Sequence, residues 1–169
     1  MALAHHQAGL SRPVSDQRRS MTTRCLTAAT TGVVIALAAG CSSPSLRAAE
    51  ASTAYEPVLR EVADAATTAT KAQWVESSAG GVQAVGDGCT WFSRTLTSQT
   101  DLSNPPQWGP VVSATEEALR KHGFASATSS ELKGGYTGVE SGDERGARLT
   151  ISAKGSTTLR ITVPVSDGC

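Results

Sequence analysis

The chain has 169 residues, of which 39% are hydrophobic and only 4% aromatic, a size and composition that fit one small globular domain and exclude a multidomain protein. Four of the 15 basic residues and one of the 15 acidic residues precede Cys41, which leaves 11 and 14 after it and a net charge of −3 for that part. This mildly acidic part has no cluster of Lys and Arg, which argues against a protein that binds nucleic acid.

The first forty residues are typical of a bacterial export signal. Residues 25–40 form an uncharged apolar run of 16 residues, which is shorter than the about 20 residues that a membrane span needs. Arg18, Arg19 and Arg24 precede this run, and a basic start before an apolar middle is the pattern of a signal peptide. We therefore predict that residues 1–40 are a signal peptide that is removed on export.

Two points about this signal stay open. Met21 would by itself open a signal of ordinary length, in which case residues 1–20 are an over-extended start. With Met1 as the start, Arg18 and Arg19 form a twin-arginine pair that lacks the Phe-Leu usually found after it. The sequence therefore does not decide between Met1 and Met21, or between the Sec and Tat export routes.

The signal ends in Leu-Ala-Ala-Gly-Cys at residues 37–41, which resembles the lipobox of bacterial lipoproteins, although Ala38 stands where leucine is most common. Small residues before the cut let a signal peptidase reach the backbone, and the thiol of Cys41 is the group that carries the diacylglyceryl thioether. The resemblance implies lipidation of Cys41 and a protein anchored at the extracytoplasmic face of the cell membrane. The alternative is an ordinary secretory cut, with Cys41 paired elsewhere.

The remaining cysteines predict one disulfide. Cys25 lies in the removed segment and Cys41 would carry lipid, which leaves Cys89 and Cys169. In the oxidising compartment outside the cytoplasm an even number of cysteines is read as a set of disulfides. We therefore predict a bond between Cys89 and Cys169.

The exported chain begins with a short tether at residues 41–52, which are small and polar, and continues as a single domain over residues 53–169. Apolar residues at helical spacing predict a first helix over residues 53–73, beginning with a capping box at Thr53. Pro57 is compatible with a helix only in its first turn, so the start near Thr53 is open by a few residues.

Glycines and prolines divide the middle of the chain. The glycines of residues 80–88 predict a hairpin or a pair of loops over residues 74–88. Residues 89–97 have the composition of a strand, with Trp91 and Phe92 on opposite faces. Three prolines in residues 101–110 predict a loop.

The second half predicts one helix and a hairpin. The helix covers residues 110–122, and Gly123 followed by Phe124 predicts a left-handed cap with an apolar contact after it. Alternating apolar residues joined by a glycine-containing turn predict an antiparallel hairpin. The expected strands are residues 135–140, 147–153 and 157–165, with a turn over residues 142–146. The residues expected to face inward are Leu149, Ile151, Leu159, Ile161 and Val163. The fold is therefore predicted to be α+β, with two helices packed on one face of an antiparallel sheet of about four to five strands.

The sequence contains no recognisable catalytic motif. His122 is the only histidine after Cys41, and its place in the last turn of a helix already suits the helix dipole. No serine stands at a recognised spacing from a base, and the adjacent Glu116 and Glu117 point about 100° apart on a helix. We therefore predict no catalytic residues, no metal ligands and no cofactor.

Three tryptophans are the large aromatic residues that could contact a ligand. Trp74, Trp91 and Trp108 either fill the core, as so small a domain requires, or line a groove for a glycan or a lipid. Trp108 is the stronger candidate for ligand contact because it lies in a proline-rich loop, and Trp91 is the second.

The chain as a whole resembles the uncharacterised lipoproteins of actinobacteria, of which LppA-like proteins are an example. The shared pattern is a lipobox, an Ala-rich helix, a tryptophan near the upstream cysteine, a helix ending in Lys-x-Gly at Lys121 to Gly123, and a last hairpin ending in Gly168-Cys169. The resemblance implies an envelope lipoprotein and no particular activity.

Three functions follow from these observations. The first is a non-enzymatic binding or accessory module of the cell envelope, whose partner is a protein, a glycan or a lipid. The second is a carrier of a lipid or small molecule, which would need an apolar cavity between helices and sheet. The third is a hydrolase, which would need a cleft that brings His122 together with a serine and a carboxylate.

Overall fold

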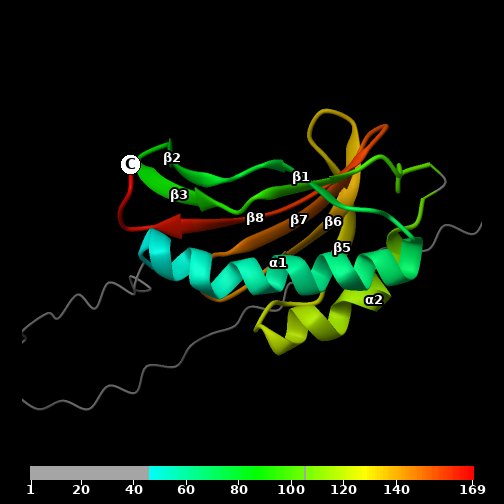
Figure 1. Ribbon diagram of the computed structural model, residues 1–169, viewed down its shortest axis with the longest axis horizontal. Coiled ribbons are helices and arrows are strands. Elements are labelled where there is room, and N and C mark those ends of the chain that lie inside the picture. The colour runs from blue at the N-terminus through cyan, green and yellow to red at the C-terminus, as the bar shows by residue number, and fades with distance from the viewer. Residues whose placement is uncertain (1–45, 105) are drawn as a thin grey trace, which may run out of the picture. The chain divides into compact units, whose positions relative to one another are not determined.

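The computed structural model describes residues 46–104 and 106–169. The predicted signal peptide, the lipidation site Cys41 and residues 42–45 of the predicted tether lie outside the described residues. The described part has two layers, in which both helices lie against one face of a single antiparallel sheet (Figure 1).

Two helices and eight strands make up these layers. The helices are α1 (Ala48–Thr70) and α2 (Trp108–Lys121), and the strands are β1 (Val75–Ser78), β2 (Gly81–Val85), β3 (Gly88–Phe92), β4 (Thr95–Ser98), β5 (Thr128–Leu132), β6 (Tyr136–Gly142), β7 (Arg148–Ala153) and β8 (Thr157–Val165).

All of the paired strands run antiparallel. Their order across the sheet is β1-β4-β8-β7-β6-β5, and the hairpin of β2 and β3 joins the same sheet through β8. The predicted α+β class is confirmed. The predicted number of strands, four to five, is wrong, because the described part of the chain has eight.

The difference arises mainly in the hairpin of residues 75–98, whose two arms are each bent into two strands. Gly80 lies at the bend of one arm with φ of 76°, and a Cβ atom there would overlap the backbone of Phe92 and Ser93 on the other arm. Ser93 continues the pairing across the bend, since its N–H donates to the carbonyl of Ile161 at 2.9 Å. Strand β5 was not predicted, because its sequence, Thr-Ser-Ser-Glu-Leu, has no apolar alternation. It lies at the edge of the sheet.

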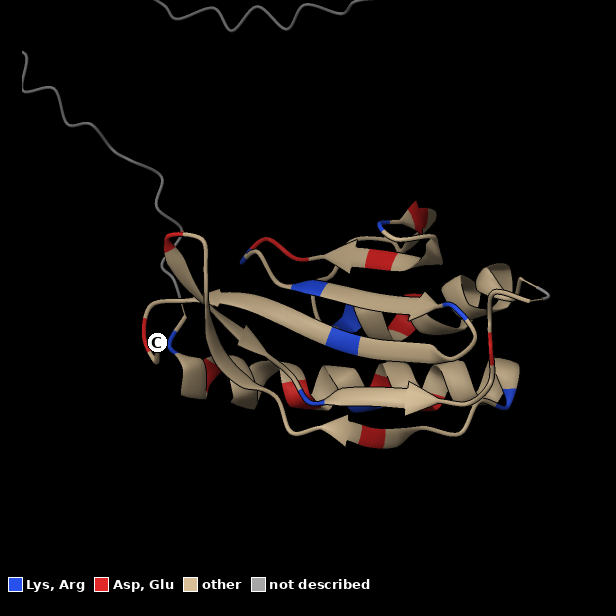
Figure 2. Ribbon diagram, turned by 90° about the horizontal axis from the view of Figure 1, so that it is seen from above, with Lys and Arg blue, Asp and Glu red and all other residues tan. Residues whose placement is uncertain are grey.

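Strand β8 forms the centre of the core. Its alternate residues are buried under the helices, and the same face of β7 contributes further apolar side chains. The opposite face of the sheet carries no helix among the described residues (Figure 2). The predicted inward-facing residues are confirmed, and all are fully buried: Leu149, Ile151, Leu159, Ile161 and Val163.

Helix α1 begins at Ala48 and continues through Pro57, so the start expected near Thr53 is wrong. A proline inside a helix removes one backbone hydrogen bond. Burial on the same face outweighs this loss, since Ala51 and Tyr55 are 0% and 3% exposed. Residues 48–52, assigned to the tether by prediction, therefore belong to the folded domain.

The cap of α1 comes from the other end of the chain. Asp167 accepts a hydrogen bond from the N–H of Ala48 at 2.7 Å and contacts the Arg47 guanidinium at 3.2 Å. The bond from Ala48 and then the one from Arg47 hold the pKa of Asp167 below its usual range. A carboxylate at this position also stabilises the positive end of the helix dipole. Two residues after Asp167, Cys169 forms a disulfide with Cys89, which is the predicted pair. This bond holds the segment that contains Asp167 in place.

Helix α2 ends as the sequence predicts. Gly123 has a φ of 78°, and the N–H of Phe124 donates to the carbonyl of Leu119 at 3.0 Å. Phe124 is 5% exposed, so the apolar contact after the cap is also present. Among the described residues, neither helix combines the length and the apolar character that crossing a bilayer requires.

The disulfide is predicted to contribute strongly to stability, because it closes a loop of 80 residues. The variant Cys89→Ser/Cys169→Ser should lose up to about 4.5 kcal/mol of the free energy of unfolding, as the chain-entropy relation gives for such a loop. Urea denaturation measures the loss. Reductant should lower the stability of the wild-type protein to that of the variant and leave the variant unchanged; equal stability of the oxidised protein and the variant would contradict the prediction.

Gly138 is predicted to be required by packing between β6 and its neighbours. A Cβ atom at this position would overlap the carbonyl oxygen of Ile151 and lie 2.9 Å from the Leu132 side chain. Gly138→Ala should therefore lower the free energy of unfolding by about 1–3 kcal/mol, measured by thermal or urea denaturation. Gly88→Ala is the matched control, because no atom lies within 4 Å of its added Cβ. Equal effects of the two variants would show that overlap is not the cause.

Candidate functional site

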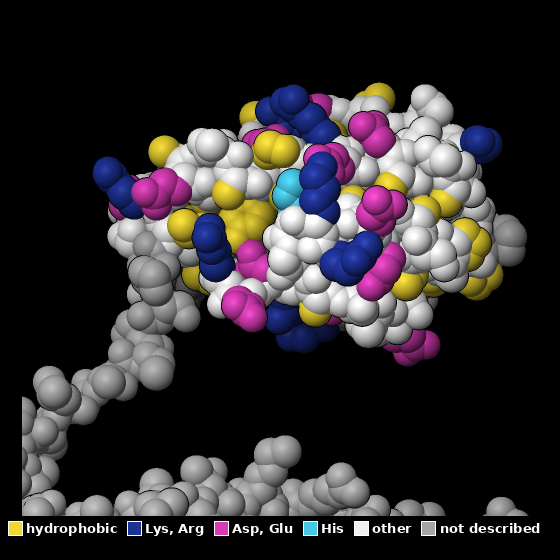
Figure 3. All heavy atoms as spheres, turned by 90° about the horizontal axis from the view of Figure 1, so that it is seen from below, with side chains coloured by type: hydrophobic (Ala, Val, Ile, Leu, Met, Phe, Trp, Pro, Cys, Tyr) yellow, Lys and Arg dark blue, Asp and Glu magenta, His cyan; other side chains and the backbone are white. Residues whose placement is uncertain are grey.

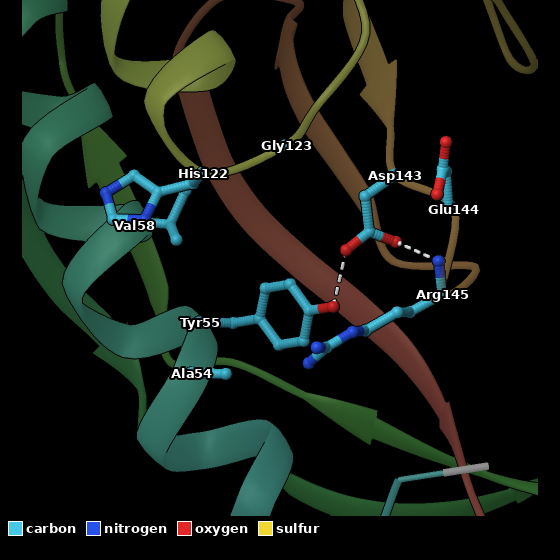
Figure 4. Close-up of a pocket in the computed structure, with 8 residues that line it drawn as sticks. All are labelled: Ala54, Tyr55, Val58, His122, Gly123, Asp143, Glu144 and Arg145. Carbon is cyan, nitrogen blue, oxygen red and sulfur yellow. Dashed lines mark hydrogen bonds between the residues drawn. The ribbon is translucent and has the colours of Figure 1, made fainter. Parts of the chain in front are cut away.

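A pocket of about 480 Å³ lies where helix α1, the end of α2 and the turn between β6 and β7 meet. Figure 3 shows the hollow on the face that bears the helices, with hydrophobic side chains at its bottom and charged side chains around it. The residues that line it are Ala54, Tyr55, Val58, His122, Gly123, Asp143, Glu144 and Arg145 (Figure 4).

The chain after α2 forms one side of the pocket. Gly123 turns the backbone out of the helix, and the N–H of Ala125 then donates to the carbonyl of Gly142 at 2.8 Å. This bond places the end of α2 beside the β6–β7 turn. His122 therefore lies next to residues that follow it by about twenty positions in the sequence.

The β6–β7 turn is built around Asp143. One carboxylate oxygen of Asp143 accepts hydrogen bonds from the N–H groups of Arg145 and Ala147, at 2.9 and 2.8 Å. A short side chain that bonds the backbone two residues later is a common way to fix a turn. The sequence predicts this turn over residues 142–146, but not its contact with α1.

That contact is a hydrogen bond between Tyr55 and Asp143. The Tyr55 hydroxyl donates to the second carboxylate oxygen of Asp143 at 2.5 Å (Figure 4). The ring also packs edge-on against Phe124, with 6.0 Å between the centroids. Burial, and then the bond and the charge of Asp143, raise the pKa of Tyr55 well above its usual range. The phenol therefore stays protonated and remains a donor.

Arg145 supplies the positive charge of the pocket. Its side chain turns away from the Asp143 carboxylate and runs past the Tyr55 ring toward α1 (Figure 4). Within residues 46–104 and 106–169, no carboxylate lies within ion-pair distance of its guanidinium. The guanidinium is therefore open to a ligand.

His122 forms the opposite wall and is bound to α1. Its Nε2 lies 3.1 Å from Oε2 of Glu61. The other carboxylate oxygen, Oε1, accepts a hydrogen bond from the Lys121 ammonium at 2.9 Å. The bond from Lys121 and then that from His122 hold the pKa of Glu61 below its usual range. His122 is thus part of an ion-pair cluster that joins the two helices, in keeping with the structural role expected from its position.

The pocket brings His122 and two carboxylates together, but the described residues that line it include no serine or cysteine. Asp143 already accepts three hydrogen bonds, so it is not free to act as a general base. In the part of the chain that the structure describes, no three His, Cys, Asp or Glu side chains are grouped to hold a metal ion.

The tryptophans proposed as ligand contacts are buried, and this expectation is wrong. Trp91 is 6% and Trp108 8% exposed, and both belong to the hydrophobic core. Trp108 lies in the first turn of α2 rather than in a loop, and its indole N–H donates to the Thr137 hydroxyl at 3.1 Å. A small domain with few aromatics uses them to fill its interior.

Comparison with known proteins leaves the family open. No protein-family model matches the chain, and no curated protein does. Among solved structures the chain is similar to a crystal structure of a DUF4853 family protein from Actinomyces odontolyticus, with 13% sequence identity and a TM-score of 0.48. The similarity covers 70% of this chain and 68% of that protein.

The Tyr55–Asp143 bond predicts a dependence of stability on alkaline pH. The pKa of tyrosine in the unfolded chain is about 10, whereas in the folded protein the pKa of Tyr55 is higher. Below about pH 10 the contribution is fully present; above it the unfolded state loses its proton first, so the free energy of unfolding falls as pH rises. Urea denaturation between about pH 9 and 11 measures this fall, which should be steeper in the wild-type protein than in Tyr55→Phe.

At neutral pH the same variant should lose about 1–3 kcal/mol, because a carboxylate loses its hydroxyl donor. Tyr136→Phe is the control, since that ring is 42% exposed on the surface and should leave the alkaline fall unchanged. Identical pH profiles for wild type and Tyr55→Phe would contradict the assignment.

Proposed function

We propose that the protein is a lipoprotein of the cell envelope, anchored through Cys41 to the extracytoplasmic face of the membrane, and that it acts as a non-enzymatic binding module. The pocket beside Tyr55, His122 and Arg145 is its binding site. The observation that carries this proposal is the Arg145 guanidinium, which is open to a ligand in a pocket where Asp143 already accepts three hydrogen bonds.

Export and anchoring are supported by the signal pattern of residues 1–40 and by the disulfide. A bond between Cys89 and Cys169 is expected of a protein outside the reducing cytoplasm. Cys41 lies five positions before Leu46, whose backbone bridges to Val165. At about 3.3–3.6 Å per residue this segment spans no more than about 18 Å, which keeps the domain close to the membrane.

The pocket lies near the anchored end of the domain. Ala54 follows the first residue of α1 by six positions, which is about 9 Å along a helix. A ligand from the membrane surface or the adjacent wall would therefore reach the pocket. The size of the pocket, about 480 Å³, supports a small ligand rather than a protein interface.

The two other functions have less support. A carrier would need an apolar cavity, whereas charged and polar side chains form much of this pocket's lining. A hydrolase would need a nucleophile beside His122, and the described lining residues supply none. Membership of the LppA-like lipoproteins of actinobacteria remains part of the proposal, supported by the lipobox-like residues 37–41 and the final Gly168-Cys169.

Replacement of the lipidated cysteine tests the anchor. In the native host or a related bacterium, Cys41→Ser should move the protein from the membrane fraction to the soluble fraction and abolish incorporation of labelled palmitate, because no other thiol can carry the thioether after the cut. Cys25→Ser is the matched control, since this residue lies in the predicted signal and should leave labelling intact. Wild-type protein that incorporates no label would refute the anchor.

A further inference from the structure

The lining of the pocket contains one positive side chain, Arg145, and two negative ones, Asp143 and Glu144, which differ in how far the protein already uses them. Asp143 accepts hydrogen bonds from the Tyr55 hydroxyl and two backbone N–H groups, so its charge is already compensated by donors. Glu144 lies at the rim and points away from Tyr55 (Figure 4). Glu61 beside His122 is paired with Lys121. Among the described residues, the Arg145 guanidinium makes no ion pair, and neither does the Glu144 carboxylate at the rim. Arg145 is therefore the positive group of the pocket that an anion could contact.

An arginine that lacks a carboxylate partner is suited to an anion. Its planar fork of N–H donors matches a carboxylate or a phosphate, to which it donates two parallel hydrogen bonds. Arg145 is an exposed residue whose side chain extends beside the Tyr55 ring, so an anion bound there would lie next to α1 (Figure 4). Asp143 helps to hold this position, because it bonds the backbone N–H of Arg145 and so fixes the start of the side chain.

The bottom of the pocket is apolar. Ala54 and Val58 lie one turn apart on α1, and the edge of the Tyr55 ring lies between them. Tyr55 and Val58 are almost fully buried, with 3% and 1% exposure, so the apolar area that a ligand can cover is small. It suits a short aliphatic or aromatic group rather than a whole acyl chain.

We propose that this pocket binds a small anion in which a carboxylate or phosphate stands beside a short apolar group, with Arg145 contacting the anion and Ala54 and Val58 contacting the apolar part. This inference rests on the proposed function and names its ligand class. A free organic acid and the head group of an anionic lipid share this chemistry.

The test uses the full chain carrying Cys41→Ser, so that no attached lipid competes, and follows backbone NMR shifts during titration. The probes are octanoate, its neutral counterpart octanol, and inorganic phosphate alone. Octanoate is expected to shift the signals of residues 54–58 and 143–145, and to bind more tightly than octanol or phosphate. Sedimentation with phosphatidylglycerol vesicles then distinguishes a lipid head group from a free acid: binding to vesicles that competes with octanoate identifies the lipid.

Matched variants identify the contact. Arg145→Gln is expected to weaken octanoate binding about tenfold or more, and Arg145→Lys to restore part of it. Arg160→Gln, an exposed arginine on the uncovered face of the sheet, should have no effect. Ala54→Trp should block the pocket, whereas Thr53→Trp, exposed but outside the lining, should not. Thermal denaturation checks that each variant is folded.

Two outcomes overturn the inference in different ways. If octanol binds as well as octanoate, is blocked by Ala54→Trp and is unaffected by Arg145→Gln, the pocket is a binding site but not one for anions. If none of the probes shifts a signal at millimolar concentration, the ligand class is wrong. The proposed function is then judged separately, by palmitate labelling and by native mass spectrometry of protein extracted from the envelope.

Discussion

The antiparallel pairing of strand β8 on both of its edges is the constraint on which the rest of the domain depends. Along one edge β8 pairs with β7, and along the other with β4 and then β3. Loss of this strand would separate the hairpin of residues 75–98 from strands β5, β6 and β7. Its alternation of buried and outward residues determines which face receives the helices. The segment after β8 adds a second restraint, because Asp167 caps α1 and Cys169 is bonded to Cys89.

The pocket is a consequence of how α1 is fixed. Its first turn is held by Asp167, and a point two turns later is held by the bond from Tyr55 to Asp143. Lys121 and His122 bind Glu61 further along the same helix. These contacts come from three separate parts of the chain. Together they leave a hollow between the end of α2 and the β6–β7 turn, with a rigid border and an unpaired guanidinium at its edge.

The polar groups of this hollow differ in what they are free to do. Asp143 and Glu61 are engaged in holding elements together, so their charges are used within the protein. Among the described residues that line the pocket, Arg145 and Glu144 make no ion pair. A guanidinium without an ion pair at the edge of a pocket is suited to contact with an anion, which is the basis of the proposed binding site.

Local pattern by itself determined much of the fold. The alternation in residues 147–165 predicted the central hairpin and its buried side chains, because strand faces follow a period of two. The Gly123–Phe124 cap and the turn around Asp143 were likewise predictable, since each depends on neighbouring residues. The start of α1 was not, because one part of its cap lies 119 positions away in Asp167, in addition to the local bond from the Arg47 N–H to Glu50. The edge strand β5 was also not predictable, because it pairs with β6 but its sequence has no apolar pattern.

The candidate site depended on tertiary structure to a greater degree. Tyr55 and Asp143 are separated by 88 residues, and no spacing rule connects them. Its place in a proline-rich stretch suggested Trp108 as a surface contact, whereas packing placed it in the core. The sequence alone predicts an export signal and lipidation at Cys41 and leaves one pair of cysteines to form a disulfide, because these predictions depend on consecutive residues or on a count. Only the tertiary structure decided which side chains come into contact. The residues of a binding site are close in space, but they can be far apart along the chain, so no local pattern predicts them.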